Sequence, residues 1–187
     1  MQRTTPMSRN ERDPALQANK LGAMWAVLDR ALVGALEDYS LSSAAIVLWL
    51  SYGPPMSVGD LSKVLGLSQP ACSRAVDRLA DTGFVRKSHS GSRETWVEIL
   101  AAGRAEAERL QARRLSVLGA VLSTLTKTER AQFATLLDKL LAGVVEDRAY
   151  ARHVCRLCDH GVCDGPLCPV GCRATQMEES AQRDEGG

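Results

Sequence analysis

The sequence has few aromatic residues, little net charge and no long apolar run. Phe, Tyr and Trp make up 4% of the 187 residues, and the formal net charge is +1. No apolar run approaches the roughly 20 residues that span a bilayer, and the first residues lack the apolar stretch of a signal peptide. These absences predict a globular, cytoplasmic protein. A near-neutral balance argues against a general nucleic-acid coat but is compatible with a local basic patch.

Common catalytic motifs are also missing. The chain has no nucleophile elbow, no Gly-rich phosphate loop and no H-E-x-x-H pair. Its three histidines are scattered: His89 lies in a turn-rich segment, and His153 and His160 lie among clustered cysteines. We therefore predict that the protein is not an enzyme.

Residues 57–79 have the pattern of two short helices joined by a tight turn. Ser57 and Ser68 stand at helix N-cap positions, and Gly66 stands where the first helix should end. Apolar residues of the second helix recur on one face: Cys72, Val76 and Leu79. The pattern predicts a helix-turn-helix, with Cys72 in the core.

The other face of the second helix is polar and basic. Ser and Gln side chains can contact base edges in the major groove, and Arg can reach guanine or phosphate. We predict that Gln69, Ser73 and Arg74 approach the bases, while Lys63, Arg78, Arg86 and Lys87 hold phosphates. Ser68, at the start of this helix, is also predicted to be a DNA-binding residue.

A hairpin is predicted directly after the helix-turn-helix. Residues 84–87 and 95–99 are rich in strand-forming residues, and the segment between them is rich in Ser and Gly. Two helices followed by a hairpin make a winged helix. Arg93, near the tip, is predicted to enter the adjacent minor groove, where negative potential is concentrated.

This order of elements resembles the MarR-type transcriptional regulators over roughly residues 15–150. The resemblance is carried by the S-x-x-x-S-R-x-V-x-x-L helix, the D-T-G-F-V-R step and the I-L-A-A-G-R exit. In the wing only Arg93 matches, because Gly91 and Ser92 stand where the family has an acidic residue and a first Arg. The resemblance implies a homodimer on a pseudo-palindromic operator, acting as a repressor that responds to a small ligand.

The fold class expected is mainly α with a small β wing, and long helices flank the winged helix. We predict a flexible arm at 1–13, a helical dimerisation domain from 14–40 and 101–151, and the DNA-binding domain at 41–100. Ser42 is the predicted cap of the helix over 41–51, and Thr126 with Glu129 forms a capping box. The charged, aperiodic residues 175–187 are predicted to be disordered.

Residues 152–174 form a Cys-rich segment that holds five of the six cysteines, spaced C-x2-C-x4-C-x4-C-x3-C. In a reducing compartment such clusters favour metal ligands or redox thiols. The first four cysteines resemble a zinc knuckle with Cys in the His place, although Asp159 and Val162 replace its glycines. Cys168-Pro169 is similar to the ending of ferredoxin cluster motifs.

We predict a metal site for zinc or an iron–sulfur cluster. Its predicted ligands are Cys155, Cys158, Cys163 and Cys168, with Cys172 as an alternate ligand. A redox disulfide and an unliganded tail remain alternatives, and coupling of metal or redox state to DNA binding is a hypothesis. The alternative function is a metal-stabilised protein-interaction factor of anti-sigma-like type.

Overall fold

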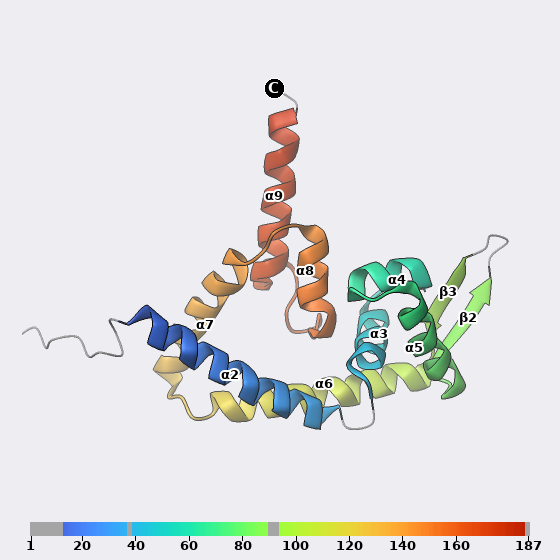
Figure 1. Cartoon of the computed structure of the whole chain (residues 1–187), viewed down its shortest axis with the longest axis horizontal. Helices are drawn as coiled ribbons and strands as arrows, with labels where there is room; N and C mark the ends of the chain where they lie inside the picture. Colours follow the sequence, from blue (N-terminus) through green and yellow to red (C-terminus); the bar gives the residue numbers. More distant parts are fainter. Residues whose placement is uncertain (1–12, 37–38, 90–93, 186–187) are drawn as a thin grey trace, which may run out of the picture.

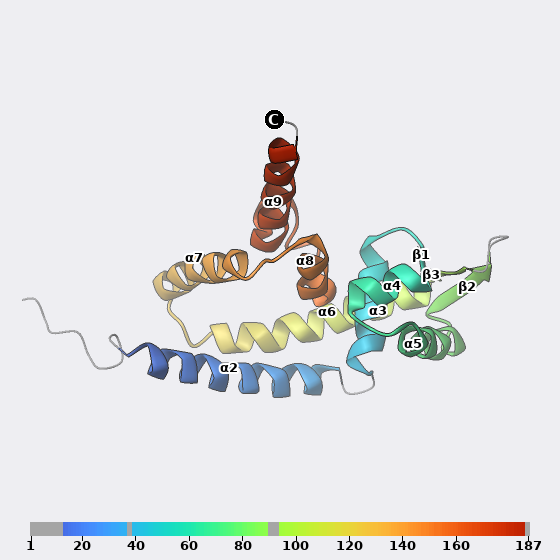
Figure 2. The same cartoon turned by 45° about the horizontal axis from the view of Figure 1, so that its top comes forward.

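The computed structural model describes residues 13–36, 39–89 and 94–185. Two long helices, α2 (Pro14–Ala35) and α6 (Ala101–Leu122), lie side by side along the molecule (Figures 1 and 2). One end of α6 leads into the winged helix, and the other leads into α7 (Lys127–Gly143). The expected fold class, mainly helical with a small sheet, is confirmed.

The winged helix consists of three helices and a three-stranded sheet. Its helices are α3 (Leu41–Tyr52), α4 (Val58–Leu65) and α5 (Gln69–Asp81). The sheet has the order β1-β3-β2 and is antiparallel throughout, with β2 (Val85–His89) and β3 (Thr95–Ile99) as the predicted hairpin. The short β1 (Met56–Ser57) was not predicted. It pairs with Val97 and Trp96, because the Pro54-Pro55 step leaves the chain extended beside β3.

The main core is built around α3. This helix is apolar on nearly all sides, as expected of a helix at the centre of a domain, and Ile46, Leu48 and Leu50 are at most 1% exposed. Helices α4 and α5, the sheet and α6 contribute one apolar face each, including Leu61, Val76, Val97 and Leu110. This packing holds α5 with its opposite face toward solvent.

The residues after α7 form a second, smaller unit. It contains α8 (Arg148–Val154), the 3₁₀ turns η1 (Cys155–Leu157) and η2 (Gly165–Leu167), and α9 (Pro169–Glu185). Its own core has only four buried residues: Val145, Ala151, Val170 and Ala174. Helix α9 points away from the rest of the molecule in both views (Figures 1 and 2). We call residues 148–185 the C-terminal module.

The prediction of a disordered tail was wrong for residues 175–185, which belong to α9. Its first turns are held in place by tertiary contacts that charge composition cannot show. Arg148 donates to Thr175 Oγ1 at 2.7 Å and to both carboxylate oxygens of Glu178, at 3.0 and 2.6 Å. Ala174 and Met177 pack on the small core.

Other boundaries also differ from the predictions. Ser40, not Ser42, caps α3, because its Oγ accepts the Ser43 N–H at 3.1 Å. The capping box of Thr126 and Glu129 is confirmed, and the helix that it opens, α7, ends at Gly143. The predicted arm lies outside the described residues except for Asp13, which caps α2. In the described ranges, no helix is both long and apolar enough to cross a membrane.

Gly103 marks the closest approach of α6 to the wing and gives a stability prediction. A Cβ there would overlap the Phe84 carbonyl group and come within 2.9 Å of Ile99 Cγ1. Because a backbone carbonyl cannot change rotamer, we expect Gly103→Ala to lower the free energy of unfolding by about 1–3 kcal/mol. Urea unfolding at one fixed protein concentration measures the loss.

Gly119→Ala is the matched control on the same helix, because a Cβ there meets no atom within 4 Å. It should leave stability unchanged or raise it slightly through helix propensity. Equal effects of the two substitutions would contradict the close contact at Gly103.

Candidate DNA-binding surface and cysteine segment

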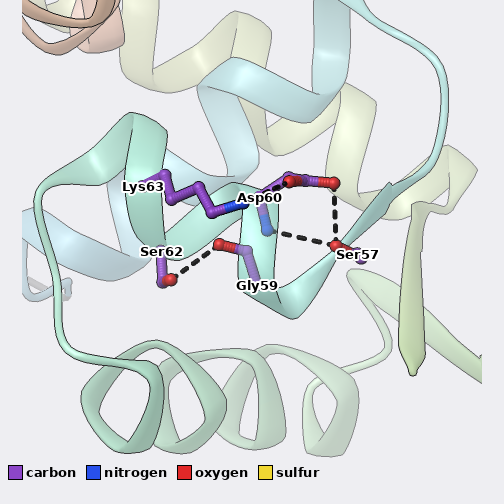
Figure 3. Close-up of polar contacts among 5 residues, drawn as sticks. All are labelled: Ser57, Gly59, Asp60, Ser62 and Lys63. Atoms are coloured by element: carbon purple, nitrogen blue, oxygen red, sulfur yellow. Dashed lines mark hydrogen bonds and ion pairs between the residues drawn. The ribbon is translucent and has the colours of Figure 1, made fainter. Parts of the chain in front are cut away.

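The first helix of the helix-turn-helix is anchored at its N-terminus by Ser57 (Figure 3). Ser57 Oγ accepts the Asp60 N–H at 3.1 Å and donates to Asp60 Oδ2 at 2.9 Å. Lys63 Nζ lies 3.3 Å from Asp60 Oδ1. The Ser57 hydrogen bond, and then Lys63, lower the pKa of Asp60. The helix ends at Gly66, whose φ of 63° is left-handed and favours glycine.

Helix α5 has a buried apolar face and a solvent-facing polar face. Ser68 caps it, with Oγ accepting the Ala71 N–H at 3.4 Å. Cys72 and Val76 are 0% exposed, which confirms that Cys72 is a core residue. Burial raises the pKa of the Cys72 thiol to about 11, so this thiol is unsuited to oxidation sensing.

The predicted base-contacting residues lie together at the outer side of α5. Gln69 and Arg74 are exposed and Ser73 is half-buried, and Gln69 and Ser73 line an open groove of about 370 Å³ beside the start of β3. Within the described ranges, no ion pair occupies Arg74 or Arg78. Both guanidinium groups are therefore available to an outside anion.

The remaining predicted phosphate contacts are paired within the chain. Arg86 lies 2.6 Å from Glu98 across the hairpin, and Lys87 lies 2.6 Å from Asp77 of α5. Lys63 pairs with Asp60 as described above. These exposed pairs are weak, so a phosphate can compete for the cations. Arg93 lies outside the described residues.

Four of the five clustered cysteines come together in the C-terminal module. Cys155 and Cys158 are presented by the η1 turn, in which Cys158 N–H donates to the Cys155 carbonyl at 2.9 Å. The Cys155 thiol interacts with those of Cys158 and Cys168, and the Cys163 thiol interacts with that of Cys168. An open cavity of about 490 Å³, lined by Cys155, Cys163 and Cys168, connects the cluster to solvent.

The contact between the two thiols shifts the pKa values of Cys155 and Cys158 in opposite directions. The interaction with the Cys158 thiol, followed by burial, raises the pKa of Cys155. The pKa of Cys158 is lowered, first by the hydrogen bond from Cys155 and then by the positive charge of Arg114.

The alternate ligand, Cys172, has a different environment. Its Sγ donates to the Gly165 carbonyl at 3.3 Å, whereas Gly171 N–H donates to Cys168 Sγ at 3.2 Å. Among the described residues, no group of three or more Cys, His, Asp or Glu side chains is placed so that it could hold a metal ion. The sulfurs are neighbours, but they do not yet form a closed ligand set.

Sequence reasoning missed the residues that dock the cysteine segment on the winged helix. Tyr52 Oη donates to Asp159 Oδ1 at 2.7 Å, and its ring stacks on His160 at 5.2 Å between centroids. The His160 ring also meets Trp49 edge-on at 5.6 Å. The Asp159 bond, after burial, raises the pKa of Tyr52 to about 12. No local pattern predicts a contact between residues 107 positions apart.

The fold and the exposed face of α5 define a winged helix-turn-helix protein. A family model described as "MarR family" matches residues 37–93, which include α3, the helix-turn-helix and the first strand of the hairpin. Members of this family and the structural neighbours are transcription regulators and not enzymes, which confirms the prediction on catalysis.

One sequence relative is the uncharacterized HTH-type transcriptional regulator YwhA of Bacillus subtilis (strain 168). It is 27% identical over 86 residues, which are 45% of this chain and 62% of that protein. The match therefore spans less than two thirds of the relative's length.

Solved structures share the fold. YusO from Bacillus subtilis has a TM-score of 0.63 at 19% identity, covering 72% of this chain and 97% of that chain. The Mycobacterium tuberculosis MarR family protein Rv2887 in complex with DNA has a TM-score of 0.55 at 26% identity, covering 66% of this chain and 95% of that chain.

Rv2887 in complex with p-aminosalicylic acid has a TM-score of 0.53 at 28% identity, covering 66% and 96% of the two chains. These neighbours are covered almost completely, whereas more than a quarter of this chain has no counterpart in them.

The N-cap of α4 gives a second stability prediction. We expect Ser57→Ala to cost about 1 kcal/mol of unfolding free energy at neutral pH, since it removes the cap bond to the Asp60 N–H. The folded-state pKa of Asp60 is depressed, so the part of the stability that comes from its ionised carboxylate is lost as pH falls through that pKa. The deficit of Ser57→Ala should therefore shrink in acid.

Ser62→Ala is the control on the same helix. The Ser62 hydroxyl only donates to the Gly59 carbonyl, at 2.7 Å (Figure 3). This change should cost less than Ser57→Ala and show no matching dependence on pH. Chemical denaturation at several pH values tests both variants, and a pH-independent deficit for Ser57→Ala would contradict the role of the Asp60 carboxylate.

Proposed function

We propose that this protein is a dimeric transcriptional regulator that binds a pseudo-palindromic DNA site through α5. The observation that carries the proposal is the division of α5 between a fully buried apolar face and an exposed face, whose Arg74 and Arg78 have no ion-pair partner among the described residues. The Rv2887 complex with DNA supports the same use of this fold here. Such a role would place the protein in the cytoplasm with its operator.

In the proposed complex α5 lies in the major groove. Gln69, Ser73 and Arg74 approach base edges near the start of the helix, and Arg78 reaches a phosphate one turn later. Lys63, Arg86 and Lys87 exchange their carboxylate partners for phosphates, and Arg93 enters the minor groove. Ser68 caps the helix end that faces the DNA.

A second copy of the chain is the proposed partner. Among the described residues of these two helices, α7 has no buried residue and α2 has one, Ala35. Large apolar side chains on these helices face outward, including Trp25 at 69%, Leu21 at 64%, Leu136 at 58% and Leu140 at 57% exposure. Large apolar side chains gathered on the exposed faces of neighbouring helices favour a protein–protein interface. Two-fold pairing would present two α5 helices to successive major grooves.

Repression and release by a ligand complete the proposal. A ligand that prefers the dimer conformation with the wrong separation of the two α5 helices would weaken operator binding by its differential affinity. The Rv2887 complex with p-aminosalicylic acid supports a small aromatic acid as one class of effector to test.

Arg74 provides the direct test of DNA reading. We expect Arg74→Ala to weaken binding to the selected operator by about 1–3 kcal/mol, or roughly 5- to 150-fold, because one base or phosphate contact is lost. The operator is first obtained by selection from a randomised duplex library. Fluorescence anisotropy at one salt concentration then compares the variant with the wild type.

Arg183→Ala is the matched control, since it removes the same charge from α9, where Arg183 hydrogen-bonds Ser180 of its own helix. It should leave operator affinity unchanged. A protein-interaction factor of anti-sigma-like type would enrich no sequence and would bind DNA equally with either substitution. That result would overturn the proposed function.

The proposed dimer is tested on α7. We expect Leu136→Asp combined with Leu140→Asp to produce a monomer in light scattering, because two charges would be buried in the interface. Operator affinity should fall more than about tenfold, since the two half-sites would no longer be bound together. Leu167→Asp is the control, because Leu167 is 72% exposed but lies outside α2 and α7. A double variant that remains dimeric would contradict the assignment of α7 to the dimer interface.

A further inference from the structure

The C-terminal module is too small to be held by its own core. Residues 148–185 form one short helix, two 3₁₀ turns and one long helix around three buried residues, Ala151, Val170 and Ala174, which pack with Val145 just before the module. Units with so little buried apolar surface usually need a disulfide, a metal or a partner to stay folded. The C-terminal module therefore needs a stabilising element besides its own core.

The thiol cluster lies where such a staple is needed. Cys155 and Cys168 pack directly against the small core. The four thiols come from two turns, with Cys155 and Cys158 on η1, and with Cys163 and Cys168 on either side of η2. A link among them would join α8 to the start of α9.

The surroundings of Cys168 suit a sulfur that carries negative charge. The Gly171 N–H points at Cys168 Sγ from 3.2 Å, and a Cβ at position 171 would itself lie 3.2 Å from that sulfur. Glycine therefore allows a backbone donor to reach the sulfur. The open cavity beside the cluster provides a path by which an ion can enter.

We propose that Cys155, Cys158, Cys163 and Cys168 bind one thiophilic metal centre that latches the C-terminal module onto the winged helix. Four thiolates are the donor set of structural zinc and of iron–sulfur clusters. When Zn²⁺ binds, four S–H bonds are replaced by four Zn–S bonds and the protons pass to solvent, with no change in oxidation state. Binding of Zn²⁺ would require the four sulfurs to take up the tetrahedral arrangement of a structural zinc site, with Zn–S distances of ~2.3 Å.

The residues between the ligands contact the winged helix. Leu157, between Cys155 and Cys158, packs on the main core and accepts a 3.1 Å hydrogen bond from Gln111 Nε2 of α6. Asp159 and His160, in the next interval, bind Tyr52 of α3. If metal binding fixes the positions of the cysteines, it also fixes the residues between them that contact the winged helix.

A further contact reaches the turn of the helix-turn-helix itself. The ring of His153, two residues before Cys155, lies so close to Gly66 that a Cβ there would be 2.8 Å from it. The module also packs on α7, the proposed dimerisation helix, through α9. It thus connects the proposed dimer interface to the DNA-reading unit, and metal loading is expected to affect operator binding. This last step rests on the proposed function.

Metal analysis of the full chain tests the site itself. We expect protein purified without oxygen to carry about one zinc per chain and no colour, or iron with sulfide and a visible absorption band, and either result supports the site. Cys158→Ser should lose the metal, whereas Cys172→Ser should retain it, because Cys172 is not one of the four proposed ligands. Equal metal content in the two variants would contradict the assigned ligands.

Chelation of the wild-type protein keeps the test independent of how the variants fold. Removing the metal should increase hydrogen exchange in residues 153–163, and adding back Zn²⁺ or iron with sulfide should reverse this. A chain that has four free thiols yet takes up neither metal, or that is isolated with these thiols in disulfides, overturns the metal site.

Operator affinity of the metal-loaded and the chelated protein tests whether metal binding is coupled to DNA binding. A coupling of roughly 5- to 150-fold is expected, whereas equal affinities overturn the coupling. Failure of DNA binding in both states, with the metal still bound at one centre per chain, counts against the proposed function and not against the site.

Discussion

The structure depends on the burial of α3 against one face of each surrounding element. Helix α3 is apolar on nearly every side, so it has no stable position at a surface. Its burial fixes the backs of α4 and α5, including Leu61 and Val76, which are 0% exposed. Once those faces are committed, the polar face of α5 has to point outward. The proposed DNA-reading surface is therefore a consequence of core packing.

The charges of the winged helix divide into two groups. Arg86, Lys87 and Lys63 have carboxylate partners on neighbouring elements, and these pairs shape the surface in the absence of DNA. Arg74 and Arg78 have no such partner among the described residues. Arg74 and Arg78 both lie on α5, the second helix of the helix-turn-helix. This arrangement favours contact by α5 first and by the wing second.

YusO and the Rv2887 complex with DNA cover 72% and 66% of this chain, so more than a quarter of it is unmatched in each. The C-terminal module is a second structural unit beside the winged helix. Its cysteine segment is held on α3 and α6 by polar and aromatic contacts rather than by a large apolar interface. Such contacts are individually weak, and their strength depends on how well the segment is ordered. We therefore expect a change in the chemical state of the cysteines to alter how this segment is held without changing the main core.

The sequence alone determined the elements that local rules encode. Caps at Ser57, Ser68 and Thr126, the left-handed Gly66, the core position of Cys72 and the hairpin all follow from short-range spacing and backbone preference. Tertiary structure decided what depends on distant partners: α9 is helical because Arg148 and the small core hold it, β1 exists because β3 lies beside it, and Tyr52 meets Asp159 across 107 residues. Local patterns carry no record of such pairings, because they arise only when the whole chain packs.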